Sequence, residues 1–338
     1  MNKRTIIIDQ GETIRYGYND EDKCKEIKDI EKYDKEETKG REINWKIFEE
    51  NMRSILSVDE EKKSVIVTEK PFSLEINEDY KVWDKKYQIK RENITKILFD
   101  IDNVESLYLV TDATLSLYST GKTSGIVLDL GSENSYCVPI VDGYSHRNAL
   151  RTNISGGSIN NYIRDFVQTD IENIDKNLLD YKKHCITSSS PIEYLSNNNK
   201  CFVLPDGNTI TLPDYTNIPE IYFQPNLFSL KSLSLPSLYS NILTSCYNES
   251  LQISSESIVL TGSCSLYKNF NNRLLSELKP LVKSSYTTKI YSLPPDLLPY
   301  SVWLGGCILS SLSSFSSLML SRQEYSEGGV SMVHRKCY

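Results

Sequence analysis

Two short stretches, about 120 residues apart, share an apolar run, an Asp-x-Gly turn and a second run of strand-forming residues. The first covers residues 5–11 and continues at 16–18, and the second covers residues 126–131 and continues at 138–141. An apolar run that stops at a turn and resumes with β-branched residues is typical of a β-hairpin. Because the same hairpin occurs twice, the sequence predicts a duplicated sheet domain.

The two turns suggest a binding site. If they face each other, Asp9 and Asp129 present two carboxylates, a set that holds hydrated Mg²⁺, while turn amides bind the phosphates that the ion carries. The residues also fit two ordinary strand ends in an α/β core, because Asp-x-Gly is a common turn signal. From these two fragments alone, both interpretations stay open.

The composition limits the class of protein. The chain has 338 residues, of which 39% are hydrophobic and 25% charged, so it is long enough for two average globular domains or one large one. A net charge of −7 argues against nucleic acid or an anionic membrane as a direct partner. The eight cysteines show neither Cys-x-x-Cys nor zinc spacing, which favours reduced thiols in the cytoplasm or nucleus.

Residues 297–321 contain no charged side chain. A membrane-spanning helix of that length would hold more Leu, Ile and Val and fewer serines. We therefore expect a buried helix that packs closely through Gly305 and Gly306, and no membrane span.

The remaining elements alternate between strand and helix. We predict strands at residues 65–67, 107–110, 258–260 and 289–292, a hairpin over 201–212, and helices at 43–56, 91–100, 113–118 and 159–167. Residues 19–42 are dominated by Asp, Glu and Lys and are predicted to be a solvated loop or a frayed helix. The alternation indicates an α/β protein with mixed sheets and helical crossovers.

Several motifs, in order along almost the whole chain, resemble those of the actins and actin-related proteins. Asp-Gln-Gly at 9–11 stands at the family's first phosphate turn, and residues 114–129 resemble its Leu-Ser-Leu-Tyr-Ala-Ser-Gly and Gly-Ile-Val-Met-Asp run. Further matches lie at 138–144, 204–207, 223–225, 301–306, 323–325 and 333–338.

The resemblance implies two related lobes around a central cleft, each with a ribonuclease-H-like sheet, and ATP or ADP with Mg²⁺ in the cleft. It implies a first lobe at residues 1–120, a second at 121–300, and C-terminal helices at 301–338 that return to the first. Residues 19–42 and 168–200 are shorter than the family's upper subdomains. Because those subdomains supply filament contacts, we expect no conventional polymerisation.

The resemblance also assigns site residues by position. The metal ligands would be Asp9 and Asp129, and the residues near the attacking water would be Asp112 and Tyr136. The nucleotide-binding residues would be Gln10, Gly11, Arg15, Gly131, Ser132, Gly156, Thr261, Gly262, Ser263 and Tyr267.

Several of these positions depart from the family pattern. Asp112 replaces a water-orienting glutamine and Tyr136 replaces a histidine, which predicts little or no ATP hydrolysis. Glu12 and Glu133 are added near the phosphates, where each carboxylate at about 5 Å costs about 3 kcal/mol at an effective dielectric constant of about 20. Arg15, in place of a lysine, offsets one of them, so weak or absent nucleotide binding is expected.

The resulting hypothesis is a divergent actin-like cytoskeletal or scaffolding protein with a degenerate nucleotide site, acting as a subunit of a larger assembly. One alternative is an ATP-binding, filament-forming actin with slow hydrolysis. A second is a nuclear actin-related subunit of a chromatin-remodelling complex. The expected partners are other actin-family subunits or actin-binding proteins, and the expected location is the cytoplasm or cytoskeleton, with the nucleus open.

Overall fold

The chain divides into two compact units. The first comprises Met1–Thr123, Asp142–Arg147 and Tyr300–Tyr338, and the second comprises Ser124–Val141 and Asn148–Pro299. The structure, a computed structural model, describes residues 4–11, 13–28, 43–57, 61–74, 80–146, 149–166, 187, 199–203, 209–213, 215–245, 256–283 and 287–337.

The first unit is built on a six-stranded sheet with the order β15-β6-β4-β1-β2-β3. β1 pairs in parallel with β4, β4 pairs in parallel with β6, and β1, β2 and β3 form an antiparallel meander. The strands are β1 (Thr5–Gln10), β2 (Thr13–Tyr18), β3 (Lys25–Lys28), β4 (Lys63–Glu69), β6 (Val104–Thr111) and β15 (Leu320–Ser321), and the unit also contains the short β5 (Ser73–Leu74) and β9 (Tyr144–Ser145).

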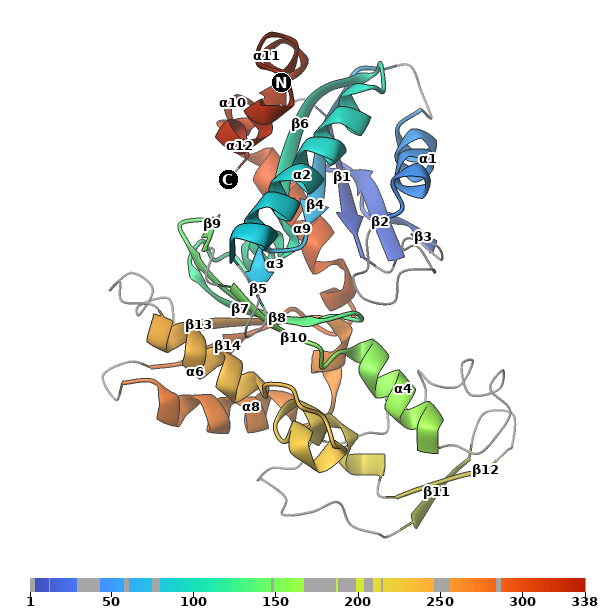
Figure 1. The fold of residues 1–338 in the computed structure, drawn as a ribbon, viewed down its shortest axis with the longest axis vertical. Helices are drawn as coiled ribbons and strands as arrows, with labels where there is room; N and C mark the ends of the chain where they lie inside the picture. Colours follow the sequence, from blue (N-terminus) through green and yellow to red (C-terminus); the bar gives the residue numbers. More distant parts are fainter. Residues whose placement is uncertain are drawn as a thin grey trace. The chain divides into compact units, whose positions relative to one another are not determined.

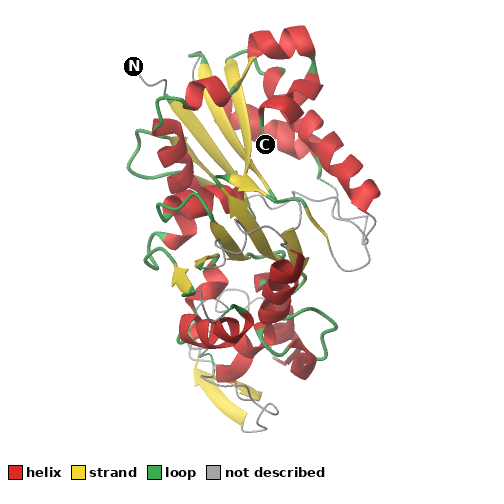
Figure 2. Ribbon diagram, turned by 90° about the vertical axis from the view of Figure 1, so that its left-hand side faces the viewer, coloured by secondary structure: helices red, strands yellow, loops and turns green. Residues whose placement is uncertain are grey.

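Helices cover both faces of this sheet, as Figures 1 and 2 show. Ile6 and Ile8 pack with α1 and α2 on one face, whereas Ile7, between them, packs with α3 and α9 on the other. This follows from the strand period of two, which sends alternate side chains to opposite faces. The helices are α1 (Trp45–Leu56), α2 (Tyr80–Phe99), α3 (Asp112–Ser119), α9 (Ser301–Ser311), α10 (Phe315–Leu318), α11 (Arg322–Gly328) and α12 (Val333–Lys336).

The predicted close packing of the uncharged segment is confirmed in α9. A Cβ atom on Gly305 would lie 1.8 Å from the carbonyl oxygen of Leu115 in α3, and one on Gly306 would lie 2.7 Å from a methyl group of Ile7 in β1. Gly305 therefore requires glycine, because no side chain fits between the two helix backbones, and a side chain on Gly306 would displace the buried Ile7 side chain. Within the described part of the chain, no helix is both long enough and apolar enough to span a membrane.

The second unit repeats the arrangement of the first. Its sheet has the order β14-β13-β7-β8-β10, in which β7 is parallel to β13, β13 is parallel to β14, and β7, β8 and β10 are antiparallel. The strands are β7 (Gly125–Leu130), β8 (Ser135–Val141), β10 (Ala149–Thr152), β13 (Ser257–Thr261) and β14 (Lys289–Tyr291), with a separate hairpin of β11 (Asn199–Val203) and β12 (Thr209–Pro213).

Helices of the second unit bury one face of its sheet. Ile126, Leu128 and Leu130 of β7 pack in one core with Ile159 of α4 and Phe270 of α8. The helices are α4 (Gly156–Phe166), α6 (Leu235–Ser245) and α8 (Phe270–Leu278), and the longest 3₁₀ segment is Tyr215–Tyr222.

The strand orders β6-β4-β1-β2-β3 and β14-β13-β7-β8-β10 match strand for strand in direction and connection. The predicted duplication, and with it the ribonuclease-H-like α/β fold, is confirmed. The prediction of a loop or frayed helix over 19–42 is wrong at residues 25–28, which form β3, the third strand of the meander. Residues 29–42, and most of the shortened region 168–200, lie outside the described residues.

The predicted bounds of α1 and α3 agree closely with the structure, whereas the predicted α2 is too short. Phe48, Met52 and Leu56 are buried in α1, as their spacing indicates, and α3 begins one residue before the prediction. α2 begins at Tyr80 rather than at residue 91. Its first half is rich in Lys and polar residues, so the helical periodicity is weak there.

Candidate functional site

In the first unit, the carboxyl ends of three neighbouring parallel strands bring polar residues together. Asp9 lies near the end of β1, Thr68 near the end of β4, and Asp112 directly follows β6. Parallel strands end at the same side of their sheet, and that side is where α/β proteins place ligands. Asp9, Thr68 and Asp112 are 6%, 1% and 4% exposed, so their polar atoms depend on one another for partners.

The hydroxyl group of Thr68 joins β1 to β4 at this point. It accepts a hydrogen bond from the Gln10 amide at 2.8 Å and donates one to Asp9 Oδ1 at 3.3 Å. The predicted phosphate-turn residue Gln10 is thus placed beside the predicted metal ligand Asp9. Its amide donates to Thr68, so this N–H group is already used within the protein.

Asp112 does not face the site as a free carboxylate. Its Oδ2 atom lies 2.5 Å from Lys70 Nζ, and its Oδ1 atom accepts a hydrogen bond from the Ala113 amide at 2.7 Å. Thr111 caps α3 by accepting from the Thr114 amide, which fixes the backbone that carries Asp112. A carboxylate held in this way has little freedom to orient a water molecule.

Burial raises the pKa of Asp9 to about 6, with a further upward contribution from the charge of Asp112. The positive charges of Lys70 and Arg15 and the hydrogen bond from Thr68 act in the opposite direction, and Lys70 has the largest effect of the three. The two carboxylates and two cations therefore partly balance one another. The sequence-based expectation of added acidic charge near the phosphates counted Arg15 as the offsetting cation but did not include Lys70.

Arg15 lies beside Asp9 but is engaged elsewhere. The strand register places Asp9, Arg15 and Glu26 side by side on β1, β2 and β3. Arg15 Nε is 2.9 Å from Glu26 Oε1, and its guanidinium lies over the ring of Tyr300. The predicted phosphate-binding cation is thus ion-paired to a residue of the strand that sequence analysis missed.

The second unit has a corresponding row of residues. Asp129 on β7 pairs in register with Tyr136 on β8, which pairs with Arg151 on β10. Thr261 lies beside Asp129 at the end of the parallel strand β13. The structure therefore brings together the predicted metal ligand Asp129, the predicted water-site residue Tyr136 and Thr261, the first of the predicted nucleotide-binding residues at 261–267. The Tyr136 side chain is 6% exposed.

The turn after β7 is held by the first residues of α4. The Gly156 amide donates to the Gly131 carbonyl at 2.9 Å, and the Gly157 amide donates to the Ser132 carbonyl at 2.7 Å. A Cβ atom on Gly157 would lie 2.9 Å from the Ser132 carbonyl oxygen, so the close approach requires glycine. The predicted residues Gly131, Ser132 and Gly156 are adjacent in space.

The predicted nucleotide-binding stretch at 261–267 contains a residue with restricted backbone geometry. Gly262 has a φ of 87°, and a Cβ atom there would lie 2.3 Å from the Leu130 carbonyl oxygen. This contact places the loop against the end of β7. Ser263 is exposed, whereas Tyr267 is 8% exposed and packs in the core near Phe270, with ring centroids 6.4 Å apart.

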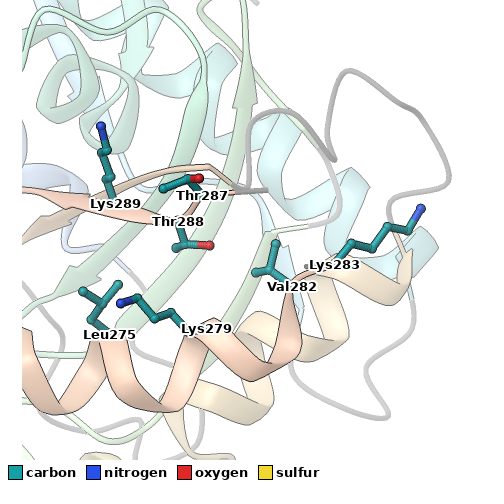
Figure 3. Close-up of a pocket in the computed structure, with 7 residues that line it drawn as sticks. All are labelled: Leu275, Lys279, Val282, Lys283, Thr287, Thr288 and Lys289. Carbon is teal, nitrogen blue, oxygen red and sulfur yellow. The ribbon is translucent and has the colours of Figure 1, made fainter. Parts of the chain in front are cut away.

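A surface hollow of about 510 Å³ lies elsewhere in the second unit, between α8 and β14. Figure 3 shows that the ammonium groups of Lys283 and Lys289 point away from each other, so they do not converge on one anion. The residues that line this hollow are Leu275, Lys279, Val282, Lys283, Thr287, Thr288 and Lys289.

The match to a known family decides how these two sets of residues are interpreted. The family model for actin matches residues 34–198 and 182–338. The chain is a member of the actin family. Members of this family generally bind ATP or ADP with Mg²⁺. Among the residues the structure describes, no group of three or more His, Cys, Asp or Glu side chains is arranged to hold a metal ion.

Sequence reasoning missed Lys70, Thr68 and Arg151. The signal for Lys70 was present, because Thr-Glu-Lys-Pro directly follows a buried run at 65–67 and Asp112 closely follows the next one at 107–110. Once those strands are taken as parallel neighbours, a lysine after one and an aspartate after the other predict an ion pair.

Proposed function

We propose that this actin-family chain is a non-hydrolysing structural subunit of a larger assembly. The observation that carries the proposal is the ion pair between Lys70 and Asp112, at the position where the family has its water-orienting glutamine. An amide can both donate to and accept from a water molecule, whereas a carboxylate can only accept, and both oxygens of this one already accept from Lys70 and from the Ala113 amide. Positioning is most of what a protein contributes to phosphoryl transfer, so its loss removes turnover.

Tyr136 is the second position that bears on hydrolysis. Its side chain is buried on β8 in register with Asp129, where the family has a histidine. A phenol has a pKa near 10 and does not accept a proton from water at neutral pH as an imidazole does. Neither of the two positions that assist water in the family therefore keeps a suitable group.

Exposed apolar residues support a role in protein contacts. Ile308 and Leu312 are 45% and 51% exposed and lie four residues apart, on one side of α9 where the helix ends. Leu318 of α10 is 43% exposed. We propose that the apolar pair Ile308 and Leu312 contacts a protein partner, an actin-family subunit or an actin-binding protein.

The test is single-turnover and steady-state phosphate release from ATP with Mg²⁺, for the wild-type chain and for the triple variant K70A/D112Q/Y136H. We expect no release above background from the wild type and measurable release from the variant, which restores the family's amide and imidazole. Wild-type turnover at a rate similar to that of the variant would refute the proposal. Binding of labelled ATP, measured in parallel, separates a loss of hydrolysis from a loss of binding.

A second candidate, an ATP-binding filament former with slow hydrolysis, is favoured by the intact glycine geometry of the second unit. Gly156 and Gly262, which stand at family glycine positions, make the close contacts that such turns need. Sedimentation and light scattering in polymerising salt with ATP test this candidate. Filaments that form only with ATP would favour it over the structural subunit.

The compartment is proposed to be the cytoplasm or cytoskeleton, or the nucleus if the chain belongs to a chromatin complex. Free thiols at Cys24, Cys137, Cys264, Cys307 and Cys337 support a reducing compartment. Co-purification from fractionated cells distinguishes the two locations and identifies the partners.

A further inference from the structure

The hollow between α8 and β14 lies at an open edge of the second sheet. Among the strands that the structure describes, β14 is the last in its row. The Lys289 amide donates to the Glu256 carbonyl at 2.8 Å, so the backbone of Lys289 faces β13. Successive residues of a strand direct their N–H and C=O groups to opposite sides, so those of Ile290 face outward, where a further strand can pair with them.

The two faces of β14 differ in chemistry. Thr288 is 5% exposed and Ile290 packs against the apolar core of the second unit, on the side of the sheet where α8 lies. Lys289 comes between them and points to the other face, as Figure 3 shows. The half-buried side chains of Leu275 and Val282 line the hollow on the α8 side. A strand added at this edge therefore meets apolar side chains on one face and an ammonium group on the other.

Three exposed lysines surround the hollow, in a chain whose net charge is −7. They are Lys279, Lys283 and Lys289. The acidic residue of α8, Glu277, binds Arg273 at 2.9 Å and so does not neutralise them. Within the described part of the chain, neither Lys279 nor Lys289 has an ion-pair partner. Their charges are therefore available to an acidic partner.

The spread of these charges favours an extended partner over a compact anion. The ammonium groups of Lys283 and Lys289 point away from each other, so a single phosphate cannot reach both (Figure 3). Carboxylates spaced along an extended chain can each meet a different ammonium group. Lysine at a strand edge also discourages pairing with neutral or basic strands. A strand that pairs with β14 therefore has to carry acidic side chains.

We propose that the edge of β14 and the hollow beside it bind an extended acidic segment of a partner protein, which adds a strand to the second sheet. In such a complex the main chain supplies hydrogen bonds and alternate side chains supply specificity. Carboxylates on one face of the segment contact Lys289, and the apolar side chains between them enter the hollow. Lys279 contacts a carboxylate that flanks this run.

The experiment measures binding of a short fluorescent peptide of alternating aspartate and valine to the full chain, by fluorescence anisotropy. The chain is tested as wild type, as K279E/K289E and as the control K231E/K268E. The control makes the same charge change at two exposed lysines of the second unit that do not line the hollow. Comparison peptides carry lysine in place of aspartate, or N-methyl groups on the backbone amides, which block strand pairing. A single-stranded oligonucleotide tests for nucleic acid.

We expect the wild type to bind the acidic peptide and K279E/K289E to bind it at least about tenfold more weakly, because attractive charge pairs become repulsive. The control should differ from the wild type by less than about twofold, because salt screens distant exposed charges. K279E/K289E should instead bind the lysine peptide, which also shows that it is folded. Bound acidic peptide should slow hydrogen exchange of the Ile290 amide but not of the Lys289 amide, which already donates to Glu256.

Four results would overturn the proposal. The first two are no binding of the acidic peptide by the wild type, and equal binding by K279E/K289E. The third is equal binding of the N-methylated peptide, which would show charge attraction without strand pairing. The fourth is tighter binding of the oligonucleotide, which would assign the lysines to nucleic acid. None of these involves ATP turnover or the Ile308–Leu312 pair, so the failure of this inference is distinguishable from the failure of the proposed function.

Discussion

The guanidinium group of Arg273 in α8 forms two parallel hydrogen bonds to the carboxylate of Glu220 inside the second unit. Nη1 lies 2.9 Å from Oε2 and Nη2 lies 2.8 Å from Oε1. Glu277 accepts from the Nε atom of Arg273 at 2.9 Å, and Gln224 donates to Glu220 at 2.6 Å. The two side chains of the pair are 1% and 0% exposed, so water contributes almost nothing to their solvation.

Removal of one partner should therefore be costly. We expect Glu220→Gln to lower the free energy of unfolding by about 3 kcal/mol, because it removes the fully buried charge partner of the guanidinium and leaves only the partly exposed Glu277. Replacement of both residues, with Arg273→Met and Glu220→Gln, should cost less than the single change. Urea unfolding measures both. The exposed pair Arg53–Glu49 is the control and should contribute less than about 1 kcal/mol.

The C-terminal region of the first unit should respond to acid. The hydrogen bond from Lys336 at 2.7 Å and that from the Ser321 amide at 2.9 Å lower the pKa of Glu324 to about 2. Because the native pKa is below the unfolded value of 4.5, the stabilisation is complete above about pH 4.5 and is lost as the pH falls toward 2.

This prediction is checked by NMR titration of the Glu324 carboxyl carbon. Lys336→Met should raise the pKa of Glu324 markedly but not to the unfolded value, because the capping box with Ser321 remains. Lys96→Met should leave the titration unchanged. An unaltered Glu324 titration in the Lys336 variant would show that the lysine does not bind there in solution.

Cys337 should resist alkylation in the native protein. Its Sγ atom accepts from the Leu109 amide at 3.3 Å, its carbonyl accepts from Arg91 at 2.8 Å, and burial raises its pKa to about 11. At pH 8 only about one molecule in a thousand carries the reactive thiolate, even where the reagent can reach it. Peptide mass spectrometry after iodoacetamide treatment should find Cys24, which is partly exposed, labelled well before Cys337. Equal rates would indicate local opening of the C-terminal segment.

Gly305→Ala should reverse the usual effect of this substitution. In a helix interior, alanine is normally favoured over glycine by up to about 1 kcal/mol. Here the new methyl group would lie 1.8 Å from the Leu115 carbonyl oxygen and 2.9 Å from its Cα atom, so α3 and α9 must separate. We expect a loss of at least about 3 kcal/mol in thermal or urea unfolding.

The control for this change is Gly121→Ala. Gly121 has a φ of 73°, and a methyl group added there would meet no atom within 4 Å, so only its backbone conformation opposes alanine. Its cost should be about 1–2 kcal/mol. A Gly305 variant no less stable than the Gly121 variant would show that the two helices can move apart.

The sequence predicts the parts of this fold that repeat or alternate strongly. The two hairpins, the amphipathic α1 and the close contact at Gly305 follow from local pattern, because apolar periodicity and glycine have direct structural meaning. β3 does not, since Lys25, Glu26 and Lys28 are charged and only Ile27 is apolar. Its strand conformation is imposed by pairing with β2, which is a tertiary effect.

The residues of the candidate site also fall into those that the local sequence predicts and those that depend on tertiary structure. Placement of Asp9 and Gly131 at strand ends and tight turns follows from the local pattern, and that of Gly156 and Gly262 was implied by the resemblance to the actin family. The ion pairs of Lys70 with Asp112 and of Arg15 with Glu26 could not, because each joins strands whose adjacency appears only when the sheet order is known. A count of charges along the sequence therefore does not predict the electrostatic potential at the site, because that potential depends on which charged side chains are neighbours in space.

The charges of β3 also have a consequence for solubility. Among the strands that the structure describes, β3 is the last in its row, so one side of its backbone has no neighbouring strand in the sheet order. Exposed strand edges recruit other chains, and lysine and glutamate side chains at such an edge discourage that recruitment. The charged residues of β3, which hide the strand from pattern-based prediction, thus also discourage other chains from pairing with its open edge.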